Sequence, residues 1–172
     1  GIDRIAATAR MLGLGEEFDL PMPSQRYGTV PDTEWKMRGY EKPWSTADTL
    51  NSTIGQGYML INPTQMCVMA ARLAMGTNLM PHYINDGKKH AGASLGIPLD
   101  HLTIIRNAMS GVVNGGGTGR RARISVPNVL MAGKTGTAQV RNITMAERRA
   151  GVRRDASLPF KLRDHALFLG FA

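Results

Sequence analysis

Four consecutive residues in the last third of the chain, Lys134, Thr135, Gly136 and Thr137, could together hold an anionic ligand. Side chains alternate along an extended strand, so the two threonine hydroxyls share one face and the lysine points to the other. Hydroxyl groups donate hydrogen bonds to a carboxylate, and a glycine between them lets a ligand backbone approach closely. The N–H groups of a strand edge are also the donors that an oxyanion hole needs. The tetrapeptide therefore predicts a site for a peptide C-terminus.

Two apolar runs, residues 129–140 and 165–172, predict the strand that carries this tetrapeptide and a second strand. A cluster of glycines precedes the first run. It follows a predicted helix rather than a strand, and its spacing matches neither the dinucleotide fingerprint nor the Walker pattern. We interpret it as a flexible turn without a phosphate-binding role; its members are Gly115, Gly116, Gly117 and Gly119.

Three periodic apolar patterns, over residues 2–12, 62–76 and 99–113, predict helices. The second has the strongest signals, because Asn62 is a good N-cap, Pro63 suits the first helical position and Gln65 completes a capping box. A short helix is also expected at about 33–38, inside a loop-rich stretch. The elements thus combine helices with at least two strands.

The positive charge of the chain is concentrated in one region. The net charge is +8 over 172 residues, and residues 120–163 hold 11 Lys or Arg against only Glu147 and Asp155. Such a cluster permits an alternative function, a non-catalytic module that binds nucleic acid or another anionic polymer. No aromatic side chain interrupts the arginines from Arg141 to Arg154, which disfavours single-stranded nucleic acid. We expect no nucleic acid; a solvated basic loop is the simpler interpretation.

Several other site classes are not expected. Cys67 is the only cysteine and cannot form an internal disulfide, so we predict a buried structural thiol. No apolar run is long enough for a membrane span. Neither a metal nor a cofactor is expected, because the four histidines are scattered without other ligands at suitable spacing: His82, His90, His101 and His165.

An ordered set of short motifs runs through most of the chain: Trp35-Lys36, Lys42-Pro43-Trp44, Asp48-Thr49, Ile54 to Tyr58, Asn62 to Met66, Lys134 to Gln139 and Leu162 to His165. In these residues the sequence resembles the class B penicillin-binding proteins, most closely the penicillin-binding protein 2 subfamily of cell elongation. The resemblance implies an α+β transpeptidase fold, shared with serine β-lactamases, in which an antiparallel sheet is flanked by helices. It also implies that residues 1–172 are the C-terminal portion of one transpeptidase domain.

The resemblance assigns roles to particular residues. It implies that Lys134 belongs to the third signature motif, that Thr135 and Thr137 hold the carboxylate of a substrate or β-lactam, and that the Thr137 N–H is half of an oxyanion hole. It implies structural support of a buried loop by Asp48, Gly55, Gln56 and Gly57. The two other signatures, Ser-x-x-Lys with the nucleophile and Ser-x-Asn or Ser-x-Asp, do not occur in the sequence. They are expected upstream, so the chain alone is predicted to be inactive.

The function that the resemblance implies is peptidoglycan D,D-transpeptidation through a serine acyl-enzyme, inhibited by β-lactams. It places the domain on the periplasmic side of a bacterial inner membrane, with peptidoglycan stem peptides as substrates and cell-elongation membrane proteins as candidate partners. A β-lactamase relative is a further alternative. That activity needs a group that activates the deacylating water, and the sequence offers no clear candidate.

Two pairs of residues imitate the missing signatures. Thr33 and Lys36 have the spacing of a nucleophile and its lysine, and Tyr83 with Asn85 resembles a variant of the second signature. However, Lys36 already matches a family segment that follows both signatures. We therefore predict that neither pair is catalytic.

Overall fold

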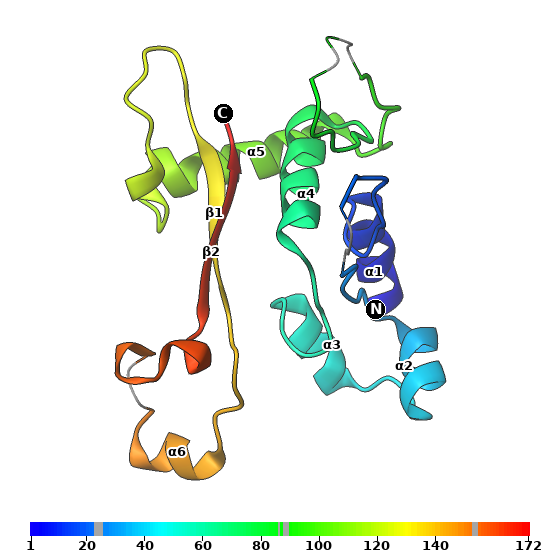
Figure 1. Cartoon of the computed structure of the whole chain (residues 1–172), viewed down its shortest axis with the longest axis vertical. Coiled ribbons are helices and arrows are strands. Elements are labelled where there is room, and N and C mark those ends of the chain that lie inside the picture. Colours follow the sequence, from blue (N-terminus) through cyan, green and yellow to red (C-terminus); the bar gives the residue numbers. More distant parts are fainter. Residues whose placement is uncertain (23–25, 86, 88–89, 153–154) are drawn as a thin grey trace.

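The computed structural model describes residues 1–22, 26–85, 87, 90–152 and 155–172 (Figure 1). The elements follow in the order α1 (Ile2–Met11), α2 (Thr33–Tyr40), α3 (Thr46–Thr53), α4 (Pro63–Met75), α5 (Leu99–Asn114), η1 (Arg120–Ala122), β1 (Ala132–Ala138), α6 (Met145–Ala150), η2 (Asp155–Ser157), η3 (Phe160–Leu162) and β2 (His165–Phe171). Helices α1 to α4 lie on one side, and the two strands with the segment between them lie on the other (Figure 1). No helix in the described ranges has the length and apolar character of a membrane span.

Capping residues explain where the helices begin. In α4, Asn62 accepts from the Gln65 N–H and Gln65 accepts from the Asn62 N–H, and Gly76 ends the helix in the left-handed region at φ 72°. The predicted capping box and stop signal are therefore confirmed. Helix α3 was not predicted, although Ser45 and Asp48 form a reciprocal capping box at its start.

The strands pair antiparallel, with Lys134 opposite Leu169, Thr135 opposite Phe168 and Thr137 opposite Ala166. Strand β1 is shorter than the predicted run of 129–140. Its ladder ends at Ala138 because the Val140 N–H donates to the side chain of Asp164 instead of to a strand backbone.

One buried cluster joins the helices to the strands. It contains Leu73 of α4, Leu102 and Met109 of α5 and Ala132 of β1, and Leu169 of β2 packs against it. The helices thus cover the face of the strands on which even-numbered β1 residues lie. The rest of the chain supplies a second cluster around α1, made by Ala6, Ala9, Leu14 and Val30.

The prediction for Cys67 was wrong. The thiol is exposed on α4, because Gln65, Val68 and Ala70 occupy the buried face of that helix. It lines a small cavity with Met66 and Leu167.

Candidate active site

Along β1, the backbone N–H and C=O groups of every second residue point away from β2. Gln56 donates from Nε2 to the carbonyl oxygen of Thr137 (3.4 Å), and Asn114 donates from Nδ2 to the carbonyl oxygen of Met131 (2.9 Å). Carbonyls of odd-numbered residues therefore point to the edge that β2 does not occupy. In an antiparallel ladder the N–H and C=O of one residue face the same side. The N–H groups of Thr135 and Thr137 consequently face this edge, where no further strand pairs within the described part of the chain.

The hydroxyl groups of Thr135 and Thr137 lie on the face of β1 opposite to α5, since α5 packs against the even-numbered residues. The Oγ1 atom of Thr118 lies 2.7 Å from Oγ1 of Thr135, so these two side chains share a hydrogen bond. Thr118 was not among the predicted site residues. The glycines that surround it were the only signal of its position in the sequence.

The glycine cluster positions Thr118 by close packing. A Cβ atom on Gly117 would lie 2.7 Å from the backbone of Val112, and one on Gly119 would lie 3.0 Å from the Val112 side chain. The Gly119 N–H also donates to the Val112 carbonyl (3.1 Å). The segment is a turn, as predicted, and its glycines allow the chain to lie directly against the end of α5.

Lys134 lies on the opposite face from the two threonines, as the alternation of the strand requires. Its side chain lines an apolar cavity of about 460 Å³ between α4, α5 and β2, together with Leu73, Ile105, Met109 and Leu169. Its Nζ donates to the Thr135 carbonyl (2.6 Å). The ammonium group thus lies at the mouth of an apolar space directly beneath the threonine pair.

The turn after α3 brings Gln56 to the strand. Gly55 and Gly57, which flank Gln56, have φ values of 74° and 77°, a region that favours glycine. The Gln56 N–H donates to the Asn51 carbonyl (2.9 Å), which holds the turn against the helix. Of the four residues predicted as structural support, Gln56 is the one that donates a hydrogen bond to β1 within the described part of the chain.

Asp48 serves the start of α3 rather than β1. Its carboxylate accepts from Lys36 Nζ, from Ser45 Oγ (2.6 Å) and from the Ser45 N–H (2.8 Å). The hydrogen bond from Lys36, followed by those from Ser45, lowers the pKa of Asp48 to about 2. Lys36 is itself buried, and its ammonium lies 5.7 Å from the ring centroid of Tyr58.

The residues that imitate the missing signatures are engaged elsewhere. Thr33 donates from Oγ1 to Asp3 (2.9 Å), whereas Lys36 binds Asp48. Tyr83 donates from its hydroxyl to the sulfur of Met22 (2.7 Å). Neither pair therefore presents a nucleophile next to a base.

Comparison with known proteins gives matches over the whole chain. Residues 1–154 match the family model described as penicillin binding protein transpeptidase domain. The peptidoglycan D,D-transpeptidase MrdA of Acinetobacter baumannii is 34% identical over 187 residues, which cover 100% of this chain and 26% of that protein. The chain thus spans about a quarter of the length of this relative.

Two solved structures share the fold. The complex between penicillin-binding protein 2 and MreC from Helicobacter pylori aligns with a TM-score of 0.80 and 28% identity, covering 99% of this chain and 29% of that one. Pseudomonas aeruginosa penicillin-binding protein 2, in complex with WCK 5153, aligns with a TM-score of 0.74 and 32% identity, covering 100% and 35%. The predicted α+β fold, with helices against an antiparallel sheet, is confirmed.

Proposed function

Because the chain belongs to the penicillin-binding protein transpeptidase family, we propose that it forms one wall of the active site of a peptidoglycan D,D-transpeptidase. The observation that carries this proposal is the geometry of β1. Thr135 and Thr137 present their hydroxyls on one face and their N–H groups at one edge of the strand. A peptide that lies along this edge meets donors for its terminal carboxylate and for the carbonyl of its last peptide bond.

In the proposed reaction, a serine outside this chain attacks the carbonyl of the penultimate D-alanine, and the terminal D-alanine leaves. The amine of a neighbouring stem peptide then attacks the acyl-enzyme and forms the cross-link. The Thr137 N–H donates to the oxygen that becomes negatively charged in both tetrahedral intermediates. The hydroxyls of Thr135 and Thr137 bind the substrate carboxylate, and Lys134 contributes a positive charge beneath them.

Thr118 joins this arrangement through its hydrogen bond to Thr135. We propose that it orients the Thr135 hydroxyl toward the carboxylate. Gln56 donates to the Thr137 carbonyl, which belongs to the peptide group that directly follows the one carrying the oxyanion donor, and so holds this part of β1 in place.

The whole protein is proposed to act on the periplasmic side of a bacterial inner membrane, where β-lactams acylate the same serine. The Helicobacter pylori relative forms a complex with MreC. We therefore propose a membrane protein of cell elongation as a partner of the whole protein. This chain alone is proposed to be inactive, because it contains no Ser-x-x-Lys sequence.

The test compares this chain with the longer protein that includes the serine, using a fluorescent penicillin and gel detection of the covalent adduct. We expect a stable label on the longer protein and none on the chain alone. The Thr33→Ala variant of the chain serves as the control, because Thr33 and Lys36 form the only Thr-x-x-Lys pair in the sequence. Stable labelling of the chain would contradict the proposal, and loss of that label in Thr33→Ala would assign the nucleophile to Thr33.

A further inference from the structure

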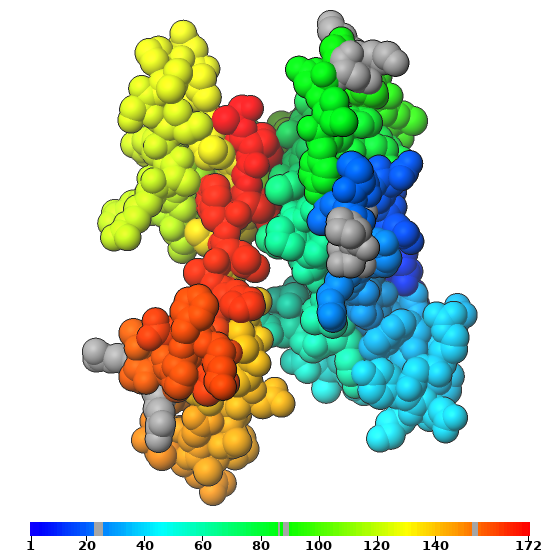
Figure 2. All heavy atoms as spheres, viewed as in Figure 1, coloured from blue at the N-terminus to red at the C-terminus, as the bar shows by residue number. Residues whose placement is uncertain are grey.

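The segment between β1 and β2 forms a lobe of its own, directly beyond Thr137 (Figure 1). The Val140 N–H donates to Oδ1 of Asp164 (3.3 Å), and the Asp164 N–H donates to Oδ1 of Asp155 (2.9 Å). These two hydrogen bonds close its base. Figure 2 shows an open cleft between this lobe and the part of the molecule that carries α2 and α3. We call the segment the basic lobe and define it as residues 139–152 and 155–164.

The acidic residues of the basic lobe are engaged within it. Glu147 accepts from Arg141 Nη1 through both carboxylate oxygens (2.8 and 2.9 Å) and from the Thr144 N–H (3.3 Å). Asp155 and Asp164 make the hydrogen bonds at the base. The negative charges of the lobe therefore stabilise its own fold.

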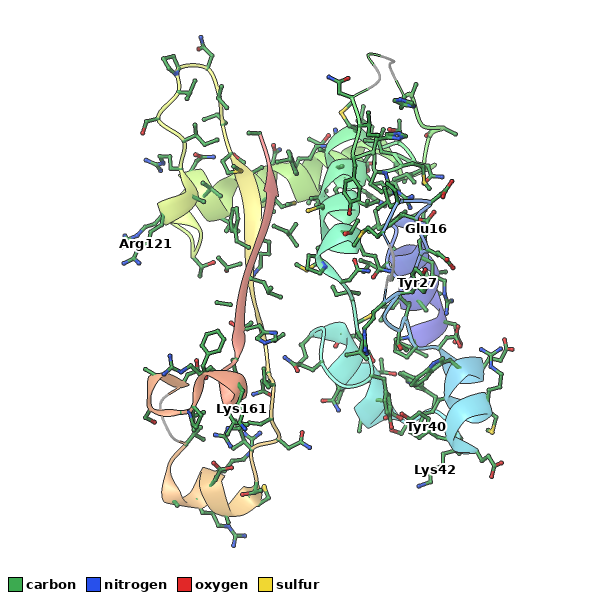
Figure 3. All side chains as sticks on the ribbon, in the orientation of Figure 1. Glu16, Tyr27, Tyr40, Lys42, Arg121 and Lys161 are labelled. Carbon is green, nitrogen blue, oxygen red and sulfur yellow. The ribbon has the colours of Figure 1, made fainter. Side chains whose placement is uncertain are left out.

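Three cations of the lobe remain on its surface. Arg148 and Arg149 lie in the last turn of α6 and Lys161 lies in η3, and all three are exposed. None of them makes a side-chain hydrogen bond or ion pair among the described residues. Phe160, the neighbour of Lys161, is 86% exposed. Figure 3 shows Lys161 on the lobe, whereas Lys42 and Arg121 lie on other parts of the surface.

The proposed chemistry gives the substrate a direction. Its terminal carboxylate binds at Thr135 and Thr137, and the carbonyl one residue earlier binds at the Thr137 N–H. The preceding residues must therefore run past Ala138 toward the lobe. An extended peptide advances about 3.4 Å per residue, so the second or third residue before the scissile bond lies beside Gln139 to Arg141.

We propose that the basic lobe binds a carboxylate of the donor stem peptide upstream of its two terminal alanines, and thereby favours donors that are acidic at this place over neutral ones. This inference rests on the proposed function, because that function sets the direction of the peptide. Exposed cations attract carboxylates over several ångströms, and ordinary salt weakens this attraction. The lobe thus selects among donor peptides, whereas the open edge of β1 binds the C-terminal end of the donor.

The experiment measures the binding of three pentapeptides to this chain by NMR chemical-shift titration at low salt. The first ends in D-alanyl-D-alanine and carries one acidic residue upstream of the alanines. The second has that upstream carboxylate converted to the amide, and the third has only its C-terminal carboxylate converted to the amide. The lobe variant is Arg148→Gln, Arg149→Gln, Lys161→Gln, and the matched control with the same loss of charge is Arg4→Gln, Lys42→Gln, Arg121→Gln. Circular dichroism confirms that both variants fold.

We expect the upstream amide to weaken binding about five- to tenfold, as a few exposed ion pairs would. The lobe variant should lower the affinity for the acidic peptide by the same factor and bind both upstream forms equally. The control variant should bind like the wild type. Equal affinity of the wild type for the acidic peptide and its upstream amide would overturn the role of the lobe.

The third peptide separates the two proposals. If C-terminal amidation abolishes binding while upstream amidation has no effect, the proposed function stands and the lobe inference is wrong. If C-terminal amidation has no effect, the proposed function and the inference fail together. Stronger competition by duplex DNA, or by vesicles containing anionic lipid, than by unlabelled acidic peptide would also overturn the inference.

Discussion

The Oγ1 atoms of Thr118 and Thr135 lie 2.7 Å apart, which links the glycine cluster after α5 to the proposed carboxylate site. If Thr118 orients Thr135, the isosteric Thr118→Val change should slow acylation of the longer protein by penicillin about three- to tenfold, the usual effect of one lost hydrogen bond. Thr118→Ser should restore most of the rate. Thr103→Val is the control, since the Thr103 hydroxyl binds the Leu99 carbonyl within α5, away from β1.

The packing of Gly117 predicts a loss of stability on substitution. A methyl group there would lie 2.7 Å from the Val112 backbone, so Gly117→Ala should lower the free energy of unfolding by about 1–3 kcal/mol. Gly111→Ala should instead raise it by roughly 0.5–1 kcal/mol, because Gly111 is an exposed helical residue with open space around it. Urea denaturation of the two variants measures both changes. Equal stability of Gly117→Ala and wild type would contradict the close packing.

The orientation of the β1 backbone predicts opposite effects of proline at adjacent positions. The Gly136 N–H faces β2, so Gly136→Pro should destabilise the protein by about 3 kcal/mol or more. The Thr137 N–H faces the open edge, so Thr137→Pro should keep the fold but lose both an oxyanion donor and the Thr137 hydroxyl, slowing acylation by roughly 10²-fold or more. Thermal denaturation and penicillin acylation of the longer protein measure the two effects. Equal unfolding of both variants would show that the Thr137 N–H belongs to the ladder.

The low pKa of Asp48 predicts a pH dependence of stability. The hydrogen bond from Lys36, followed by those from Ser45, lowers this pKa from 3.8 to about 2 in the folded state. The carboxylate therefore stabilises the fold in full above about pH 4, and this contribution is lost as the pH falls toward about 2. In Asp48→Asn the slope of stability against pH should be smaller in that window. Glu34→Gln, at an exposed surface pair, should retain the wild-type slope.

Local signals were sufficient for much of the fold. Helical periodicity and capping residues correctly predicted α1, α4 and α5, and the loop-rich stretch before residue 42 does contain the short helix α2. Helix α3 lacks an apolar stripe, because Leu50 is exposed and the buried residue is Ser52. Its capping box, Ser45 with Asp48, could have identified it.

The contacts of the candidate site were less accessible to sequence reasoning. Alternation along a strand correctly placed Lys134 and the two threonines on opposite faces. Thr118 and Thr135 are 17 positions apart, and Gln56 and Thr137 are 81 positions apart. Such contacts depend on how α3 and α5 pack against β1, which local spacing does not encode. The catalytic and binding roles of these residues stay predictions.

The open edge of β1 also determines what kind of complex the proposed peptide substrate would make. A peptide that accepts hydrogen bonds from Thr135 and Thr137 would extend the two-stranded sheet as a temporary third strand. Recognition of this type depends on backbone geometry, which every peptide shares, so discrimination must come from groups at the two ends of the bound segment. In the proposed complex the threonine hydroxyls would contact one end of the peptide, and the basic lobe would contact the other. In such an enzyme the bound peptide would pair with β1 as a strand during each reaction cycle and would leave the sheet when the cross-linked product is released.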